Sequence, residues 1–154
     1  MNSNANVAMG WSALVGVVLV AAGLVGFLNT GLVGTADNAL VRTDNVHNVV
    51  HLLTGAIALF IAFGLKGETQ ANAVIGFGLL YTIIFIAVLV SPTLFGIFSV
   101  PSNAAVHVIH FAVAAVSVLV GWMAKARFPP TPPTHQTTKN NHPTPPKPHP
   151  TPPP

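Results

Sequence analysis

The feature that most constrains this chain is a set of four long apolar segments that carry no charged side chain. They cover about residues 11–28, 46–65, 73–90 and 104–124. A helix needs roughly 20 apolar residues to cross the hydrocarbon core of a bilayer. Because only 6% of the 154 residues are charged, a soluble fold would lack the polar surface to shield four such helices. The sequence therefore predicts an all-α polytopic membrane protein with four transmembrane helices.

Composition divides the chain into a membrane domain and a tail. Residues 1–127 hold the four apolar segments, and residues 128–154 are rich in Pro, Thr and His. Such a tail has too little apolar surface to offset the entropy of ordering, so we expect it to be disordered. The first apolar segment follows an N-terminal stretch without Lys or Arg, which favours a retained helix over a cleaved signal peptide.

Polar residues and prolines mark the predicted helix ends. Asp44 precedes the second apolar segment and Asn103 precedes the fourth, and both are residue types that cap helix N-termini. Pro92 ends the third segment, because proline removes a hydrogen-bond donor and clashes with the preceding turn. Residues 66–70 are predicted as a short polar turn between the second and third helices.

The distribution of charge predicts the orientation. Lys66, Lys125 and Arg127 fall on the side of the N-terminus if the chain crosses four times, and the loop over 91–103 has no charge. By the positive-inside rule, both termini are cytoplasmic and the loops over 29–45 and 91–103 face outside. We expect a multi-pass protein of the plasma membrane, with an internal membrane as the alternative. The net charge of +3 comes from the tail region, which argues against nucleic acid as a partner.

The two halves of the membrane domain resemble each other. Aligning His51 with His110 also pairs Val49 with Val108, and Asp44 with Asn103. We expect two helical hairpins that enter from the same side, which are called parallel repeats.

Four histidines lie within the predicted helices and are the main ionisable groups there. His47 and His51 are four residues apart, and His107 and His110 are three apart, so each pair shares one helix face. His51 and His110 each follow a cap by seven residues and should lie at similar depth near the outer surface. Ionisable residues in membrane helices normally face the bundle interior and are candidates for function.

Three interpretations of these histidines stay open. They could be neutral and hydrogen-bond across the bundle to Asn48, Thr54, Tyr81 or loop carbonyls, with Asn48 and Gly55 serving packing. They could sense pH, since histidine titrates near neutrality. They could bind a cofactor through His47, His51, His107 and His110, with His51 and His110 as ligands of haem b or a transition metal. The expectation in the absence of further evidence is that no cofactor is bound.

The segment from Thr43 to Gly55 also resembles a known family. His47, Asn48, His51 and Gly55 form an HN-x-x-H-x-x-x-G motif at the start of the second helix, and His110 with Asn103 represents a second motif at the fourth. This pattern is similar to small bacterial four-helix membrane proteins known only as a domain of unknown function. The sequence departs from the family at Val108 and Ile109, where an aromatic residue and leucine are typical. The resemblance covers about residues 10–125 and implies the architecture but no activity.

We therefore expect a non-enzymatic, structural or accessory membrane protein. Its partners would be the lipid bilayer and another membrane protein or subunit. Cysteine is absent and no carboxylate pair lies within the helices, which removes the usual nucleophiles and acid–base pairs. The alternative is an electron-transfer protein with haem or metal bound by His51 and His110, and the third hypothesis is a small-solute permease.

Overall fold

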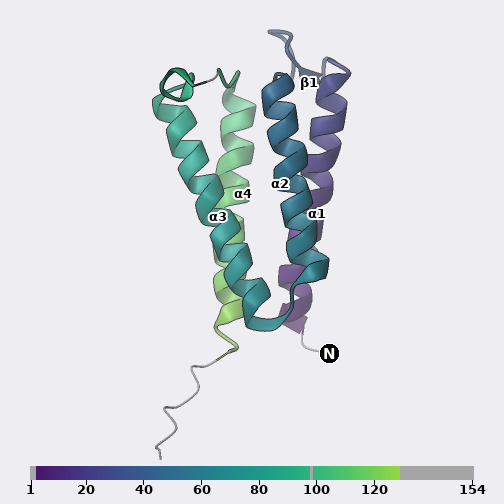
Figure 1. Ribbon diagram of the computed structural model, residues 1–154, viewed down its shortest axis with the longest axis vertical. Coiled ribbons are helices and arrows are strands. Elements are labelled where there is room, and N and C mark those ends of the chain that lie inside the picture. Colours follow the sequence, from purple (N-terminus) through teal and green to yellow (C-terminus); the bar gives the residue numbers. More distant parts are fainter. Residues whose placement is uncertain (1–2, 98, 129–154) are drawn as a thin grey trace, which may run out of the picture.

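The computed structural model describes residues 3–97 and 99–128 and shows a bundle of four long helices (Figure 1). The all-α fold with four helices long and apolar enough to span a membrane is confirmed for this part of the chain. The predicted tail beyond Phe128 lies outside the described residues. The elements are α1 (Ser3–Phe27), β1 (Val33–Gly34), β2 (Val41–Arg42), α2 (Asn45–Gly64), α3 (Gly67–Val90), the 3-10 turn η1 (Leu94–Gly96) and α4 (Ala104–Lys125).

The surface of the bundle is apolar on every helix. Leu14 of α1, Phe60 of α2, Ile83 of α3 and Trp122 of α4 all have exposed side chains. Large apolar side chains exposed along a whole bundle need an apolar surrounding, which for helices of this length is the lipid bilayer. The protein is therefore a multi-pass membrane protein.

The helices pack as two hairpins, α1 with α2 and α3 with α4, which lie side by side (Figure 1). Contacts within each hairpin are far more extensive than contacts between the hairpins. The two-hairpin arrangement is therefore confirmed, whereas the internal repeat stays a prediction from the sequence.

Glycines allow the two helices of each hairpin to approach closely. A Cβ atom added at Gly55 would lie 2.9 Å from the backbone nitrogen of Val20 on α1. A Cβ atom added at Gly121 would lie 2.8 Å from the backbone nitrogen of Ile75 on α3. Because lipid is as apolar as the helix interface, such close backbone packing supplies much of the attraction between membrane helices.

The connection between the hairpins is tighter than the sequence predicts. α3 begins at Gly67, so most of the predicted polar turn over 66–70 is its first helical turn. The buried side chain of Gln70 explains the early start, because its Nε2 donates to the carbonyls of Ile61 and Ala62 at 2.9 and 3.0 Å. These carbonyls lie near the end of α2, and satisfying them lets the chain reverse within two residues.

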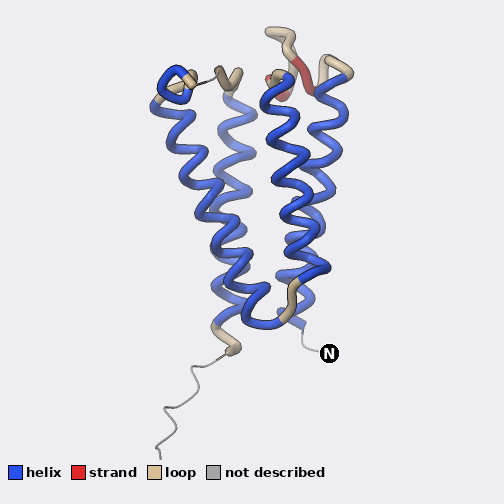
Figure 2. Tube along the Cα trace, viewed as in Figure 1, coloured by secondary structure: helices blue, strands red, loops and turns tan. Residues whose placement is uncertain are grey.

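A loop with a small parallel bridge closes the first hairpin (Figure 2). Val33 pairs with Val41 and Gly34 with Arg42, and the exposed side chains of Arg42 and Asp37 form a surface ion pair at 2.7 Å. This loop, the loop over 91–103 and the starts of α2 and α4 lie at one end of the bundle, which we call the histidine end. The α2–α3 connection and the end of α4 lie at the opposite end.

The glycine contacts predict a large difference between two single-methyl substitutions. Gly55→Ala should lower the free energy of unfolding by about 1–3 kcal/mol, because the added methyl overpacks the α1–α2 interface. Gly76→Ala is the matched control, since a Cβ atom there would meet no atom of residues 3–97 and 99–128 within 4 Å. It should leave stability unchanged or slightly raised through helix propensity. Unfolding in mixed detergent micelles measures both, and equal effects of the two substitutions would contradict the packing.

Candidate functional site

Two capped helix starts place the histidines at one end of the bundle. The Asp44 carboxylate accepts a hydrogen bond from the backbone nitrogen of His47 at 2.8 Å and caps α2. The Asn103 side-chain oxygen accepts from the backbone nitrogen of Val106 at 3.1 Å and caps α4. Each cap fixes the first helical turn, so the histidines one and two turns later have defined positions.

The Asn103 cap also connects the two hairpins. Its amide nitrogen donates to the carbonyls of Ala39 and Leu40, at 3.2 and 3.1 Å, in the loop of the first hairpin. One side chain therefore caps α4 and holds the start of α4 against the first hairpin. This link brings His110 of α4 towards α2.

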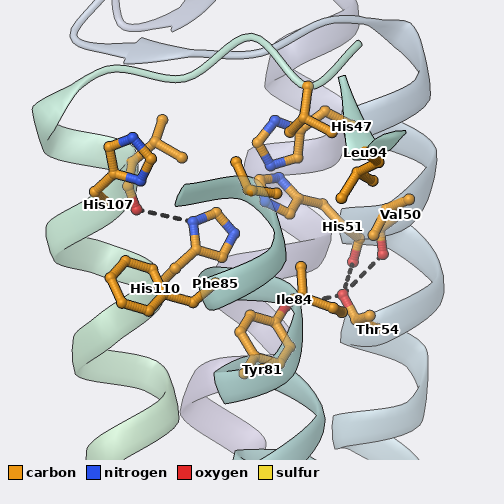
Figure 3. Close-up of a pocket in the computed structure, with 13 residues that line it drawn as sticks. His47, Val50, His51, Thr54, Tyr81, Ile84, Phe85, Leu94, His107 and His110 are labelled. Atoms are coloured by element: carbon orange, nitrogen blue, oxygen red, sulfur yellow. Dashed lines mark hydrogen bonds between the residues drawn. The ribbon is translucent and has the colours of Figure 1, made fainter. Parts of the chain in front are cut away.

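Three of the four histidines meet between the hairpins (Figure 3). Ring centroids lie 4.4 Å apart for His47 and His51, 5.6 Å for His47 and His110, and 6.0 Å for His51 and His110. Each ring offers one nitrogen such that all three nitrogens lie within 4.8 Å of one another. We call His47, His51 and His110 the histidine cluster. It contains only nitrogen ligands from both hairpins.

The hydrogen bonding of His110 defines its tautomer. Its Nδ1 lies 2.8 Å from the carbonyl oxygen of Val106 on the same helix. A carbonyl only accepts, so Nδ1 carries the proton and donates, and in the neutral ring Nε2 keeps a free lone pair. His110 thus has the hydrogen bond that orients metal-binding histidines, supplied here by a backbone carbonyl.

The other two members of the cluster, His47 and His51, are buried, and each has one ring nitrogen without a partner in the described part of the chain. The side chains of His47 and His51 are 6% and 5% exposed, and the Nδ1 atom of each has no hydrogen-bond partner among the described residues. Most buried polar atoms in folded proteins are paired, so two unpaired ring nitrogens beside each other are unusual.

His107, which the sequence places with the other histidines, does not join the cluster. Its ring packs edge-on against Phe85 of α3, with centroids 6.1 Å apart. His107 still lines the same pocket as the cluster, at its α4 side (Figure 3). His107 is thus a neighbour of the cluster in the pocket, and its role in cofactor binding stays a prediction.

The cluster borders an apolar pocket of about 170 Å³. Its walls come from α2, α3, α4 and the 91–103 loop and include Ile84, Val88, Leu94 and Val100. Tyr81 and Thr54 add two hydroxyl groups to this lining. The pocket can hold a water cluster or a small molecule beside the three histidines.

Thr54 and Tyr81 bond to each other rather than to a histidine ring. The Thr54 hydroxyl lies 2.8 Å from the carbonyl of Val50, which only accepts, so Thr54 donates to it. Tyr81 then donates to Thr54 Oγ1 at 3.0 Å, which connects α3 to α2. Both side chains are buried.

Comparison with known protein families identifies the family to which the chain belongs. A family model described as "Domain of unknown function (DUF4383)" matches residues 11–123, which is most of the chain and all four helices. The chain belongs to the DUF4383 family. The family resemblance predicted from the His47–Gly55 motif is thereby confirmed. No curated protein and no solved structure matches this DUF4383 protein.

The remaining motif residues of this DUF4383 protein serve packing. Asn48 is 1% exposed and its side chain contacts α1 at Gly26, where a Cβ atom would overlap the amide. Both polar atoms of the Asn48 side chain lack a hydrogen-bond partner among the described residues. Gly55 forms the close contact with α1 described above. Neither residue reaches the pocket.

Sequence reasoning missed the contact between the first and last helices. The Trp11 indole nitrogen donates to the Ser117 hydroxyl at 2.9 Å, across 106 residues of chain. Ser117 is completely buried, and this bond joins the hairpins nearer the opposite end of the bundle. A serine within an apolar helix is the only signal that could have indicated it, and that signal names no partner.

The Thr54–Tyr81 pair predicts a coupled loss of stability. Tyr81→Phe and Thr54→Val should each lower the free energy of unfolding by about 0.6–1.7 kcal/mol, as interhelical hydrogen bonds in membranes do. The double variant should lose less than the sum, because both substitutions remove the same bond. Thr82→Val is the control, since the Thr82 hydroxyl donates to the carbonyl of Gly78 of its own helix at 2.9 Å. Additive losses would show that the two hydroxyls act independently.

Proposed function

We propose that this DUF4383 protein is a non-enzymatic integral membrane protein with a structural or accessory role. In this role, the histidine cluster joins the two hairpins at the outer surface of the membrane. The observation that carries the proposal is that the cluster takes two rings from α2 and one from α4. The outward position of this end rests on the charge distribution of the loops.

The position of the acidic residues supports a non-enzymatic role. Asp37 pairs with Arg42 on the surface, Asp44 caps α2, and Glu68 lies in the first turn of α3 at the opposite end. These are all the carboxylate side chains of the chain. None lines the pocket, so no acid–base pair of carboxylate and histidine forms there.

An accessory role would bring another membrane protein or subunit to the histidine end. The loops there expose large apolar side chains from both hairpins, including Leu32, Leu40, Phe95 and Ile97. A surface of this kind suits the membrane interface or an apolar partner surface. Its shape depends on how the hairpins are held together, which is the task we assign to the cluster.

The second candidate function is electron transfer by a cofactor bound to the histidines. Haem b does not fit this arrangement. The His47 ring lies beside the line that joins His51 and His110, where a macrocycle between two axial ligands would have to extend. A single metal ion does not need a flat space between two histidine rings. Metal binding is therefore the part of the second candidate that retains support.

The hypothesis of a small-solute permease has weaker support than the accessory role or the metal-binding role. The pocket lies at the histidine end, and along α3 beyond Tyr81 the buried side chains of Phe77 and Val74 pack in the core of the bundle. A solute would have to displace them to cross.

Distance measurements between the hairpins test the proposed role of the cluster. The chain has no cysteine, so spin labels can be attached at Leu53→Cys on α2 and Val108→Cys on α4, two exposed positions on opposite hairpins that lie outside the Asn103 link. Adding His51→Ala or His110→Ala should broaden the distance distribution, because the cluster no longer holds α2 to α4 and only the Asn103 and Trp11 contacts remain. His107→Ala should leave the distribution as in the parent protein. An unchanged distribution in both cluster variants would refute the joining role.

A further inference from the structure

We propose that His47, His51 and His110 together bind one divalent transition-metal ion of the zinc or copper class. The proposal rests on the proposed function, since the ion would occupy the same cluster that joins the hairpins. Imidazole nitrogen is a preferred ligand of zinc, copper and nickel, whereas magnesium and calcium prefer oxygen. A site built from three histidines without a carboxylate selects the first group.

The spacing of the three nitrogens is close to that of a bound state. Two ligands at about 2.0–2.1 Å from a tetrahedral ion lie about 3.4 Å apart. The cluster nitrogens lie within 4.8 Å of one another, so each ring must move by roughly an ångström to close on an ion. Rotation of the histidine side chains supplies this movement without a change in the helices.

The orientation of His110 favours an ion over a network of hydrogen bonds. Its proton is held on Nδ1 by the Val106 carbonyl, so Nε2 offers a lone pair. His47 and His51 add two buried rings whose Nδ1 atoms have no protein partner among the described residues. An ion among the three rings would take up lone pairs that the protein's own donors do not reach.

The pocket supplies the fourth ligand. All three histidines line it, so a water molecule or a small neutral ligand in the pocket can complete the coordination. Three protein ligands with one exchangeable position is an established zinc geometry. Walls that are mainly apolar leave the ion and its fourth ligand in surroundings of low polarity, with the Tyr81 and Thr54 hydroxyls among the lining.

Metal titration tests the site, with Co²⁺ as a coloured substitute for zinc. The three tail histidines His135, His142 and His149 would bind metal themselves, so the background is the full chain with all three changed to Ala. The protein is purified through a tag without histidine, stripped with a chelator and titrated with Co²⁺ in detergent. We expect one Co²⁺ per chain, with the visible absorption of a four-coordinate ion.

Single substitutions then assign the ligands. His51→Ala and His110→Ala should each weaken Co²⁺ binding at least about 10-fold, and His107→Ala should leave it unchanged. His51→Gln and His110→Gln, which preserve volume and polarity, give the same test if the alanine variants unfold. Binding of Co²⁺ should also raise the unfolding temperature of the background protein but not of the cluster variants.

Two outcomes would overturn the metal site. One is the absence of saturable Co²⁺ binding to the background protein, and the other is binding that the cluster substitutions leave intact. The spin-label distances, measured on the chelator-stripped protein, keep this failure distinct from that of the proposed function. If Co²⁺ fails to bind but His51→Ala still broadens the distances without any metal present, the cluster joins the hairpins and the metal proposal alone is wrong.

Discussion

Close backbone contact between antiparallel helices is the constraint on which the rest of this structure depends. In lipid, burying apolar side chains gives little drive for helices to associate, so van der Waals packing and polar contacts must supply it. Gly55 and Gly121 let the helices of each hairpin approach so closely that an added methyl group would not fit between them. Each hairpin is thus a tightly packed unit, and the two units meet over a smaller area.

Polar side chains therefore decide how the hairpins sit against each other. Gln70 ties the start of α3 to the end of α2, and Trp11 bonds to Ser117 across α1 and α4. Thr54 with Tyr81 and Asn103 with the Ala39 carbonyl act nearer the histidine end. These bonds are directional, so they fix the relative rotation of the hairpins, which apolar contacts alone would leave less defined.

The sequence predicts the helices well because charge-free stretches of about 20 residues have few alternatives to a membrane span. It also places the histidines at one end, because Asp44 and Asn103 mark the helix starts. It does not reveal that His47 joins the cluster while His107 packs against Phe85. Neighbours three or four apart share a face, and which of them meets the other hairpin depends on helix rotation. That rotation is set by contacts such as the one between Trp11 and Ser117. No pattern of residue spacing in the sequence indicates that these two residues meet.

The energetics of the cluster differ from those of the other polar contacts. An interhelical hydrogen bond such as Thr54–Tyr81 stabilises a membrane bundle by about 0.6 kcal/mol on average. A buried polar atom without a partner costs about 1–3 kcal/mol, and the Nδ1 atoms of His47 and His51 are two such atoms. Apolar side chains of similar volume would fill the same space without that cost. The three imidazoles at the junction of the hairpins therefore make their contacts at this cost. In the metal site that we propose, an ion bound to their free lone pairs would offset that cost, and the stability of this junction would then depend on the occupant of the site.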